Sequence, residues 1–86
     1  MQIEFHRLFK KKYKKVPLKI QSRFDKRLLI FGTEPFHPQL NNHPLGGDKK
    51  GQWSINVTGD WRAIYSFKDE DTVVFIDIDT HSNLYK

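Results

Sequence analysis

The sequence predicts an α+β fold in which a helical hairpin packs against an antiparallel sheet. Two observations support this prediction. Apolar residues recur at helical spacing in the first third of the chain, and from residue 53 onward they recur at every second position. A stretch rich in glycine and proline separates the two patterns. The expected element order is β-α-α-β-β-β, within one domain spanning residues 1–86.

The first half of the chain is predicted to contain one strand and two helices. Residues 2–6 alternate polar and apolar side chains, as a short strand does. Residues 7–15 carry five lysines beside an apolar stripe at helical spacing. Pro17 suits the first turn of a second helix, which we expect over residues 17–31 with Gly32 as its C-terminal cap.

The second half is predicted to form a loop and then a meander of three strands. Residues 32–52 hold three prolines, four glycines and two asparagines, so this loop is either functional or packed across the surface. Strands are expected over residues 53–58, 61–67 and 72–78, and the last is apolar on both faces, like an internal strand. Residues 81–86 are predicted to form a single helical turn.

Composition excludes several classes of protein. The 86 residues contain no cysteine, which rules out disulfide scaffolds, thiolate zinc sites and cysteine nucleophiles. The longest uncharged apolar stretch, residues 28–32, is far shorter than a membrane-spanning helix, and the N-terminus lacks the apolar block of a signal peptide. We therefore expect a globular, cytoplasmic protein with no membrane partner.

Charge is unevenly distributed along the chain, whose net charge is +5. Residues 1–43 hold ten lysines and arginines against three acidic residues, whereas residues 44–86 hold five against seven. This asymmetry indicates a polyanionic partner for the first half, either nucleic acid or an acidic protein. The alternative is a solvated basic helix face without a partner.

Two of the four histidines are candidates for chemistry. His43 opens a loop with two consecutive glycines, and His81 directly follows an apolar strand. Both positions are held by a scaffold yet remain open to a ligand, and imidazole exchanges protons near neutral pH. His6 and His37 are expected to be structural or exposed. No histidine spacing matches a metal motif, so neither a metal site nor a cofactor is predicted.

The segment Asp60-Trp61-Arg62 begins a predicted strand and allows two interpretations of each of its last two residues. Trp61 packs in the core or stacks on a nucleic-acid base. Arg62 faces the other side of the sheet, where it binds phosphate or forms a salt bridge with Asp77 or Asp79. Two histidines, an arginine, an aspartate and a tyrosine are sufficient for RNA cleavage without a metal, but many small proteins contain such a set.

Longer segments carry a more specific signal. The chain reads HPL at residues 43–45, KG at 50–51, SINVTGDWRAIY at 54–65 and THSNLY at 80–85. In this order and separation they resemble the RelE/ParE toxin superfamily, and its YafQ-like branch of ribosome-dependent mRNA interferases most closely. The resemblance covers essentially the whole chain, and the fold it implies has the element order predicted above.

The resemblance also implies residue roles. His43 and His81 correspond to the family's acid and base, Arg62 to its phosphate-stabilising arginine, and Tyr85 to a catalytic or stacking aromatic residue. The residues expected to be catalytic are His43, Asp60, Arg62, His81 and Tyr85. The residues expected to bind RNA are Trp61, Lys49, Lys50 and Asn56. The lysines expected to bind the ribosome or an antitoxin are Lys10, Lys11, Lys14 and Lys15.

The function implied by the resemblance is that of a toxin in a type II toxin–antitoxin system. It would cleave mRNA in the ribosomal A site by attack of a 2′-hydroxyl on the adjacent phosphate, and a cognate antitoxin would neutralise it. One alternative is a ParE-like inhibitor of DNA gyrase, which the paired histidines disfavour because ParE-like chains usually lack them. Another is an inactive homologue that only binds its antitoxin.

Four departures from the family pattern bear on activity. Asn56 stands where YafQ-like enzymes have a third active-site histidine, Asp77 lies near a family arginine, and Asp79 replaces a glycine before the THS motif. The segment at residues 50–56 also lacks an arginine that related sequences commonly carry. Two cations and one histidine fewer, with a carboxylate beside His81, predict a weakened or altered nuclease. Alternatively, Asp79 raises the pKa of His81 and holds it charged.

Overall fold

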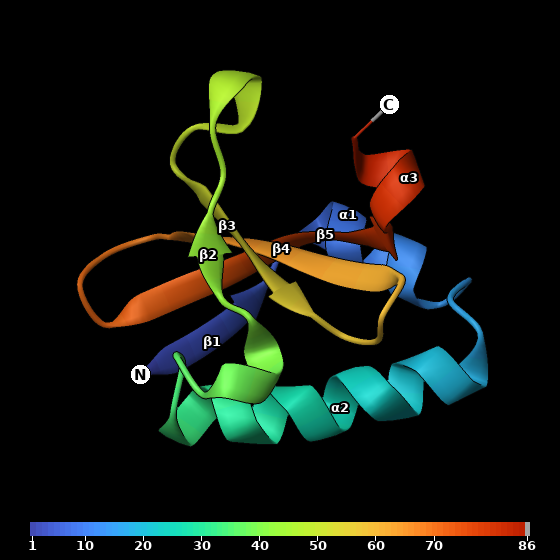
Figure 1. Cartoon of the computed structure of the whole chain (residues 1–86). Helices are drawn as coiled ribbons and strands as arrows, with labels where there is room; N and C mark the ends of the chain where they lie inside the picture. Colours follow the sequence, from blue (N-terminus) through green and yellow to red (C-terminus); the bar gives the residue numbers. More distant parts are fainter. Residues whose placement is uncertain (86) are drawn as a thin grey trace.

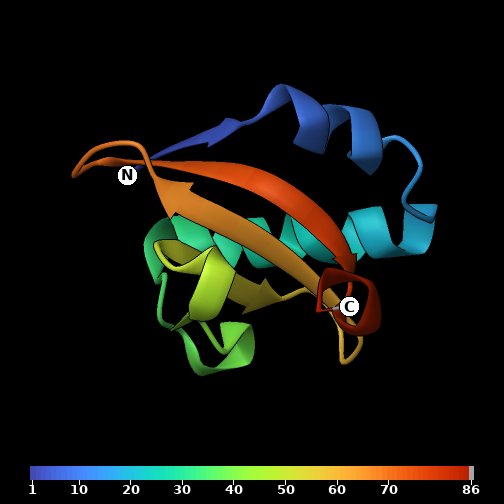
Figure 2. The ribbon, with the colours of Figure 1, turned by 90° about the horizontal axis from the view of Figure 1, so that it is seen from above.

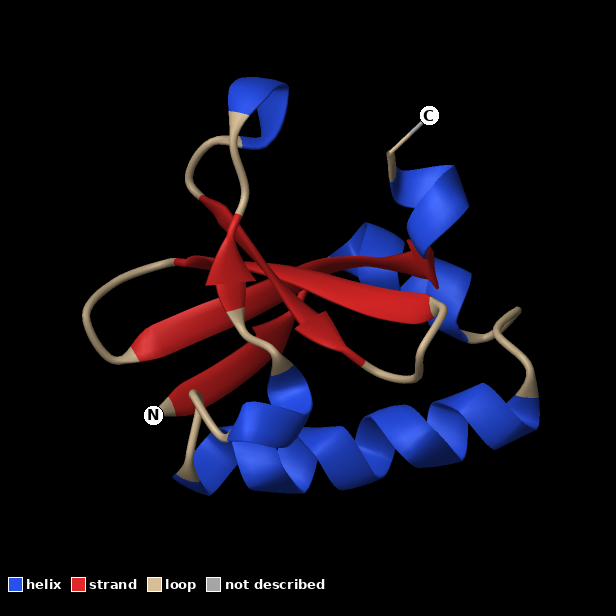
Figure 3. Cartoon of the chain, in the orientation of Figure 1, coloured by secondary structure: helices blue, strands red, loops and turns tan. Residues whose placement is uncertain are grey.

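The computed structural model describes residues 1–85, in which three α-helices accompany one five-stranded sheet (Figure 1, Figure 3). The elements are β1 (Gln2–Phe5), α1 (Arg7–Tyr13), α2 (Leu18–Thr33), β2 (His43–Pro44), β3 (Gln52–Asn56), β4 (Trp61–Phe67), β5 (Thr72–Thr80) and α3 (His81–Leu84). Their order confirms the predicted α+β fold, including the helical turn after the last strand. None of these helices is long and apolar enough to cross a membrane.

The sheet has the strand order β1-β5-β4-β3-β2 and is mixed rather than wholly antiparallel. The β3–β4 and β4–β5 pairings are antiparallel, as predicted for the three-strand meander. The β2–β3 pairing is also antiparallel, but β2 lies in the stretch that was predicted to be a loop. β1 instead pairs in parallel with β5, with Gln2 opposite Thr72 and Phe5 opposite Phe75. This pairing joins strands from the two ends of the chain. It could not be predicted, because the alternation of polar and apolar residues in β1 does not indicate which strand it pairs with.

The helices differ from the prediction at their ends. α1 stops at Tyr13, and α2 continues through Gly32 to Thr33. The helix ends because Glu34 precedes Pro35 and adopts an extended backbone with φ −137° and ψ 82°. A residue before proline is disfavoured in the helical region, so Pro35 terminates α2 and the prediction of a Gly32 cap was wrong.

An aromatic cluster joins the helices to the sheet. Phe9 of α1 and Phe24 of α2 are both 2% exposed, and their ring centroids lie 5.6 Å apart. Phe24 meets Phe75 of β5 edge-on at 5.4 Å, and Phe31 meets Tyr65 of β4 at 4.9 Å. α2 runs beneath the sheet, whereas α1 lies beside β5 (Figure 2). These contacts anchor the central strands β4 and β5, on which the candidate site is built.

The predicted loop of residues 32–52 is both packed and structured. It contains short 3-10 helices at Pro38–Leu40 and Gly47–Lys49, with β2 between them. Leu40 is fully buried, and the Tyr65 hydroxyl donates a hydrogen bond to Asn42 Oδ1 at 2.9 Å. This anchoring lays β2 along the edge of β3 and places His43 at the rim of the sheet.

Candidate active site

A cavity of about 380 Å³ opens where the β2 region, β4 and α3 meet. The residues that line it are Asn41, His43, Leu45, Arg62, His81 and Tyr85. They come from three separate parts of the chain. Four of them are catalytic residues predicted from the sequence, so the fold brings most of that set together.

Each element positions its pocket residue by local geometry. Successive side chains of a strand point to opposite faces of the sheet. The Trp61 side chain packs against the core, so the Arg62 side chain lies on the other face. Antiparallel pairing of β2 with β3 sets His43 against Ser54. β5 leads directly into α3, where the Thr80 side chain caps the helix and the His81 backbone N–H donates to the Asp60 carbonyl at 2.8 Å.

The imidazole of His43 is oriented by the backbone of Asn41. His43 Nδ1 lies 2.7 Å from the Asn41 carbonyl oxygen. Because a carbonyl only accepts hydrogen bonds, Nδ1 must carry the proton, which leaves Nε2 as the nitrogen that takes up or releases one. Asn41 adopts a left-handed conformation with φ 45°, which asparagine tolerates better than most residues. Its only signal in the sequence is the pair Asn41-Asn42 before His43.

The guanidinium of Arg62 is held by neutral groups. Its Nη1 donates to the carbonyls of Thr58 at 2.9 Å, Gly59 at 3.0 Å and Trp61 at 3.2 Å. These bonds fix the side chain at the β3–β4 turn without cancelling its charge. A fixed, uncompensated guanidinium is well suited to binding a phosphate.

Of the two interpretations that the sequence allowed for Arg62, the salt bridge with Asp77 or Asp79 does not form. Both carboxylates instead meet Lys12 of α1, at 2.7 and 2.9 Å. Lys12 reaches them at the part of the β5 edge with which β1 does not pair. Asp79 makes no ion pair with His81 within residues 1–85 either.

His81 and Tyr85 form one side of the pocket. They lie four residues apart, a spacing that stacks side chains on one face of a helix. Their ring centroids are 4.7 Å apart with an interplanar angle of 44°, and Tyr85 is 41% exposed. The pair therefore presents an imidazole and a phenol to solvent at the mouth of the cavity.

The histidines outside the pocket are structural, as predicted. His6 Nδ1 accepts from the Leu8 backbone N–H at 3.0 Å and caps α1. His37 Nδ1 accepts from the Gln39 backbone N–H at 3.1 Å and caps the first 3-10 helix. Across the described part of the chain, no group of three or more His, Cys, Asp and Glu side chains is arranged to hold a metal ion.

Other predicted RNA contacts lie around the pocket rather than in it. Asp60 is exposed in the β3–β4 turn and contributes its carbonyl to the His81 N–H. Lys49 lines an adjoining hollow with Tyr85, and Lys50 is exposed beyond it. Asn56 pairs with Arg62 across β3 and β4, and its buried Oδ1 has no hydrogen-bond partner within residues 1–85.

Trp61 lies on the opposite face of the sheet from the pocket. It packs against the core and borders a hollow shared with Lys12 and Lys15 of the α1 region. Of the two interpretations that the sequence allowed, this placement supports core packing.

The basic residues of the α1 region lie outside the pocket. Lys10 and Lys14 line a groove between α1 and α2, Lys15 is near Trp61, and Lys11 is exposed.

Sequence reasoning missed two pocket residues, Asn41 and Leu45. Leu45 belongs to the HPL segment, but an apolar residue in a loop gives no chemical signal.

Comparisons with known proteins identify the family of the chain. A family model described as a bacterial toxin of type II toxin–antitoxin system, YafQ, matches residues 1–86. The chain is 34% identical over 71 residues to the endoribonuclease HigB of Proteus vulgaris, and the match covers 77% of each protein.

Solved structures show the same fold. The DinJ–YafQ complex of E. coli matches with 27% identity and a TM-score of 0.70, over 99% of this chain and 98% of the other. The H87Q mutant of E. coli YafQ matches with 22% identity and a TM-score of 0.82, over the same shares. From the match along its full length, the chain belongs to the YafQ family of bacterial toxins of type II toxin–antitoxin systems.

Proposed function

We propose that this toxin is an endoribonuclease that cleaves mRNA on the ribosome in the cytoplasm, by attack of a 2′-hydroxyl on the neighbouring phosphate. The observation that carries the proposal is the convergence of His43, Arg62, His81 and Tyr85 on one cavity. Similarity to an endoribonuclease supports the same reaction class.

The geometry suggests a role for each group. His43 Nε2 takes the proton of the 2′-hydroxyl as that oxygen bonds to phosphorus. Arg62 stabilises the charge that develops on the phosphorane oxygens. His81 in its protonated form gives a proton to the 5′-oxygen as the P–O5′ bond breaks. The products are a 2′,3′-cyclic phosphate, which can open to a 3′-phosphate, and a 5′-hydroxyl, while Tyr85 stacks on or hydrogen-bonds the substrate.

The paired histidines distinguish this function from the two alternatives. A gyrase inhibitor or an inactive homologue acts by binding alone and needs no two imidazoles beside a fixed arginine. Asn56, Asp77 and Asp79 depart from the family pattern, but none of the three lines the cavity that holds His43, Arg62 and His81. The loss of family groups at these positions therefore leaves an acid, a base and a cation in place.

Translation of a defined mRNA in a purified system tests the proposal. We expect primer extension to map cuts within codons when the protein is added, and the new 5′ ends to carry hydroxyl groups. The same mRNA without ribosomes should stay intact, which tests ribosome dependence separately. An mRNA that stays whole in both reactions, together with loss of gyrase supercoiling activity, would establish the ParE-like alternative.

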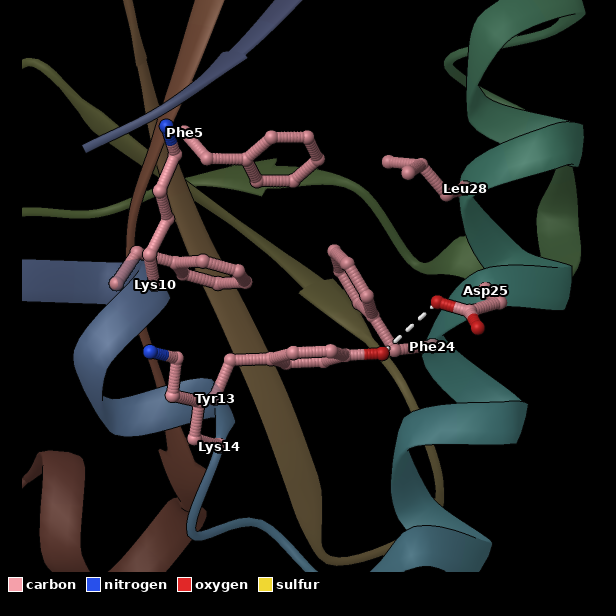
Figure 4. A pocket seen from close by; sticks show the side chains of 8 residues that line it. Phe5, Lys10, Tyr13, Lys14, Phe24, Asp25 and Leu28 are labelled. Carbon is pink, nitrogen blue, oxygen red and sulfur yellow. Dashed lines mark hydrogen bonds between the residues drawn. The ribbon is translucent and has the colours of Figure 1, made fainter. Parts of the chain in front are cut away.

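We also propose that an acidic, amphipathic segment of the cognate antitoxin binds the groove between α1 and α2. The groove has a volume of about 390 Å³ and is lined by Phe5, Phe9, Lys10, Tyr13, Lys14, Phe24, Asp25 and Leu28 (Figure 4). The Tyr13 hydroxyl donates a hydrogen bond to Asp25 at 2.8 Å. Burial, and to a smaller extent this bond, raises the pKa of Tyr13. Because two lysines, Lys10 and Lys14, outnumber the one carboxylate of Asp25, the rim of the groove is positive, which favours an antitoxin segment with acidic residues beside an apolar anchor.

Neutralising the groove lysines should weaken this complex selectively. We expect Lys10→Gln with Lys14→Gln to lower antitoxin affinity about tenfold, because two rim charges at about 0.7 kcal/mol each contribute about 1.4 kcal/mol together. The matched control, Lys11→Gln with Lys15→Gln, removes the same charge outside the groove and should change affinity less than threefold. Calorimetric titration at two salt concentrations measures both, and equal effects would show that only net charge matters.

Ribosome association is the other predicted role of these lysines. Neutralising Lys10, Lys11, Lys14 and Lys15 together should weaken binding to ribosomes and flatten its salt dependence, since each lost phosphate contact removes a released counterion. Sedimentation with 70S ribosomes at two salt concentrations measures this. Binding that is unchanged at both concentrations would assign the four lysines to solvent or to the antitoxin alone.

A further inference from the structure

The Asp79 carboxylate lies at a junction of α1, the end of β5 and α3. Its Oδ2 is 2.9 Å from Lys12 Nζ of α1. Its Oδ1 accepts hydrogen bonds from Asn83 Nδ2 of α3 at 3.0 Å and from the Thr80 backbone N–H at 2.7 Å. One carboxylate therefore links the first helix of the fold to the short helix that carries two pocket residues.

α3 needs such support because it has only four residues. A helix of this length is not stable by itself in water. The start of α3 is held by the Thr80 cap and by the hydrogen bond from the His81 N–H to the Asp60 carbonyl. One side of the helix is held by burial of Leu84. The contact from Asp79 adds a side-chain link at Asn83, which lies in the sequence between His81 and Tyr85.

The surroundings of Asp79 keep it charged and in place. Its side chain is 19% exposed. Burial raises the pKa of Asp79, but the hydrogen bonds from Lys12, Asn83 and the Thr80 N–H outweigh burial and hold the pKa below its usual value. For Lys12, burial lowers the pKa, while Asp77 and Asp79 raise it above the ordinary value. The ion pair is thus fully formed at neutral pH.

We propose that Asp79 is a positioning residue, which acts through Asn83 to hold α3 so that His81 and Tyr85 face Arg62 and His43 across the cavity. The resemblance places at this position a glycine, which has no side chain with which to make the link. Its kinetic consequence rests on the proposed nuclease function, whereas its structural consequence does not.

Asp77 provides a matched control on the same strand. It also contacts Lys12, at 2.7 Å, but its other hydrogen bond is to the Ile78 backbone N–H. Within the described residues it makes no hydrogen bond or ion pair with α3. Asp77→Ala and Asp79→Ala therefore each remove one carboxylate from Lys12, and only the second removes the link to Asn83.

The kinetic test compares these variants on ribosome–mRNA complexes. We expect Asp79→Ala and Asn83→Ala each to lower kcat about tenfold with KM unchanged, because a displaced catalytic group costs rate rather than binding. The double variant should be no slower than either single variant, since both break one link. Asp77→Ala should stay within twofold of wild type. Equal kcat values for Asp77→Ala and Asp79→Ala would overturn the proposal.

An NMR measurement gives a second readout that needs no nuclease activity. The His81 and Tyr85 rings are close enough for a ring–ring NOE in the wild type, at a centroid separation of 4.7 Å. That NOE should weaken in Asp79→Ala and Asn83→Ala and persist in Asp77→Ala. An NOE unchanged in all three would overturn the positioning role even if kcat fell. Should Asp79→Ala fail to fold, Asn83→Ala still decides the question, because it leaves the Lys12 ion pairs intact.

Discussion

Replacing His81 with alanine is expected to lower mRNA cleavage by at least about 10²-fold, the usual contribution of a general acid or base. His81 lines the cavity beside Arg62 and is the group that would protonate the leaving 5′-oxygen. Its side chain is exposed, and its backbone N–H, which donates to the Asp60 carbonyl, is kept in the variant. The loss should therefore appear in the cleavage rate and not in the free energy of unfolding.

Single-turnover cleavage on programmed ribosomes and a urea melt measure the two quantities. His37→Ala is the matched control, because it also removes one imidazole but lies outside the cavity at a 3-10 helix cap. It should cleave at the wild-type rate, and loss of the cap should lower the free energy of unfolding by about 0.5–2 kcal/mol. Cleavage by His81→Ala within about threefold of wild type would refute its catalytic role.

Arg62→Lys is expected to lose about 2–4 kcal/mol of transition-state stabilisation although it keeps the positive charge. Lysine lacks the planar fork that lets arginine bind carbonyls with one nitrogen and phosphate with the others. In the structure, Nη1 is used by the carbonyls of Thr58, Gly59 and Trp61, and Nε and Nη2 make no hydrogen bond within residues 1–85. Ribosome binding should barely change, because the interaction strengthens only as charge develops on the phosphate.

A cleavage assay and a denaturant melt on Arg62→Lys and Arg62→Ala separate catalysis from structure. Arg62→Ala removes a donor from the β3–β4 turn and should cost roughly 1 kcal/mol of stability as well as activity. Lys68→Ala is a matched control for charge, since Lys68 pairs with Glu4 at 3.1 Å outside the cavity. Full activity in Arg62→Lys would show that the guanidinium is not needed in the transition state.

Much of the candidate site could be predicted because its signals are local. His81 follows the end of an apolar strand, and Arg62 alternates with core residues on β4, so each sequence position indicates which face the side chain occupies. His43 was a candidate from its place at the start of a glycine-containing loop, and the family resemblance gave His43 and Tyr85 their specific roles. Asn41 could not be found in this way, because its role depends on a carbonyl in a left-handed backbone and not on its side chain.

Partners across long sequence separations could not be predicted. The salt bridge from Arg62 to Asp77 or Asp79 was reasonable from strand pairing, and the register does place Arg62 opposite Asp79. The carboxylates nevertheless pair with Lys12, which lies in α1 and is brought to the edge of β5 by the tertiary fold. The pattern of α1 predicted a helix, but not that one of its lysines would lie at this edge.

Local patterns in the amino-acid order specified the kind and order of the longer helices and strands, the apolar face of each, and the resemblance to the family. Periodicity acts within one element, and side-chain direction within a strand or helix follows from its backbone geometry. The tertiary structure decided the parallel pairing of β1 with β5, the placing of Trp61 against the core, and the link from Lys12 through Asp79 to Asn83. Each depends on which elements meet in space, and that is set by packing of the shared aromatic core rather than by any local stretch of chain.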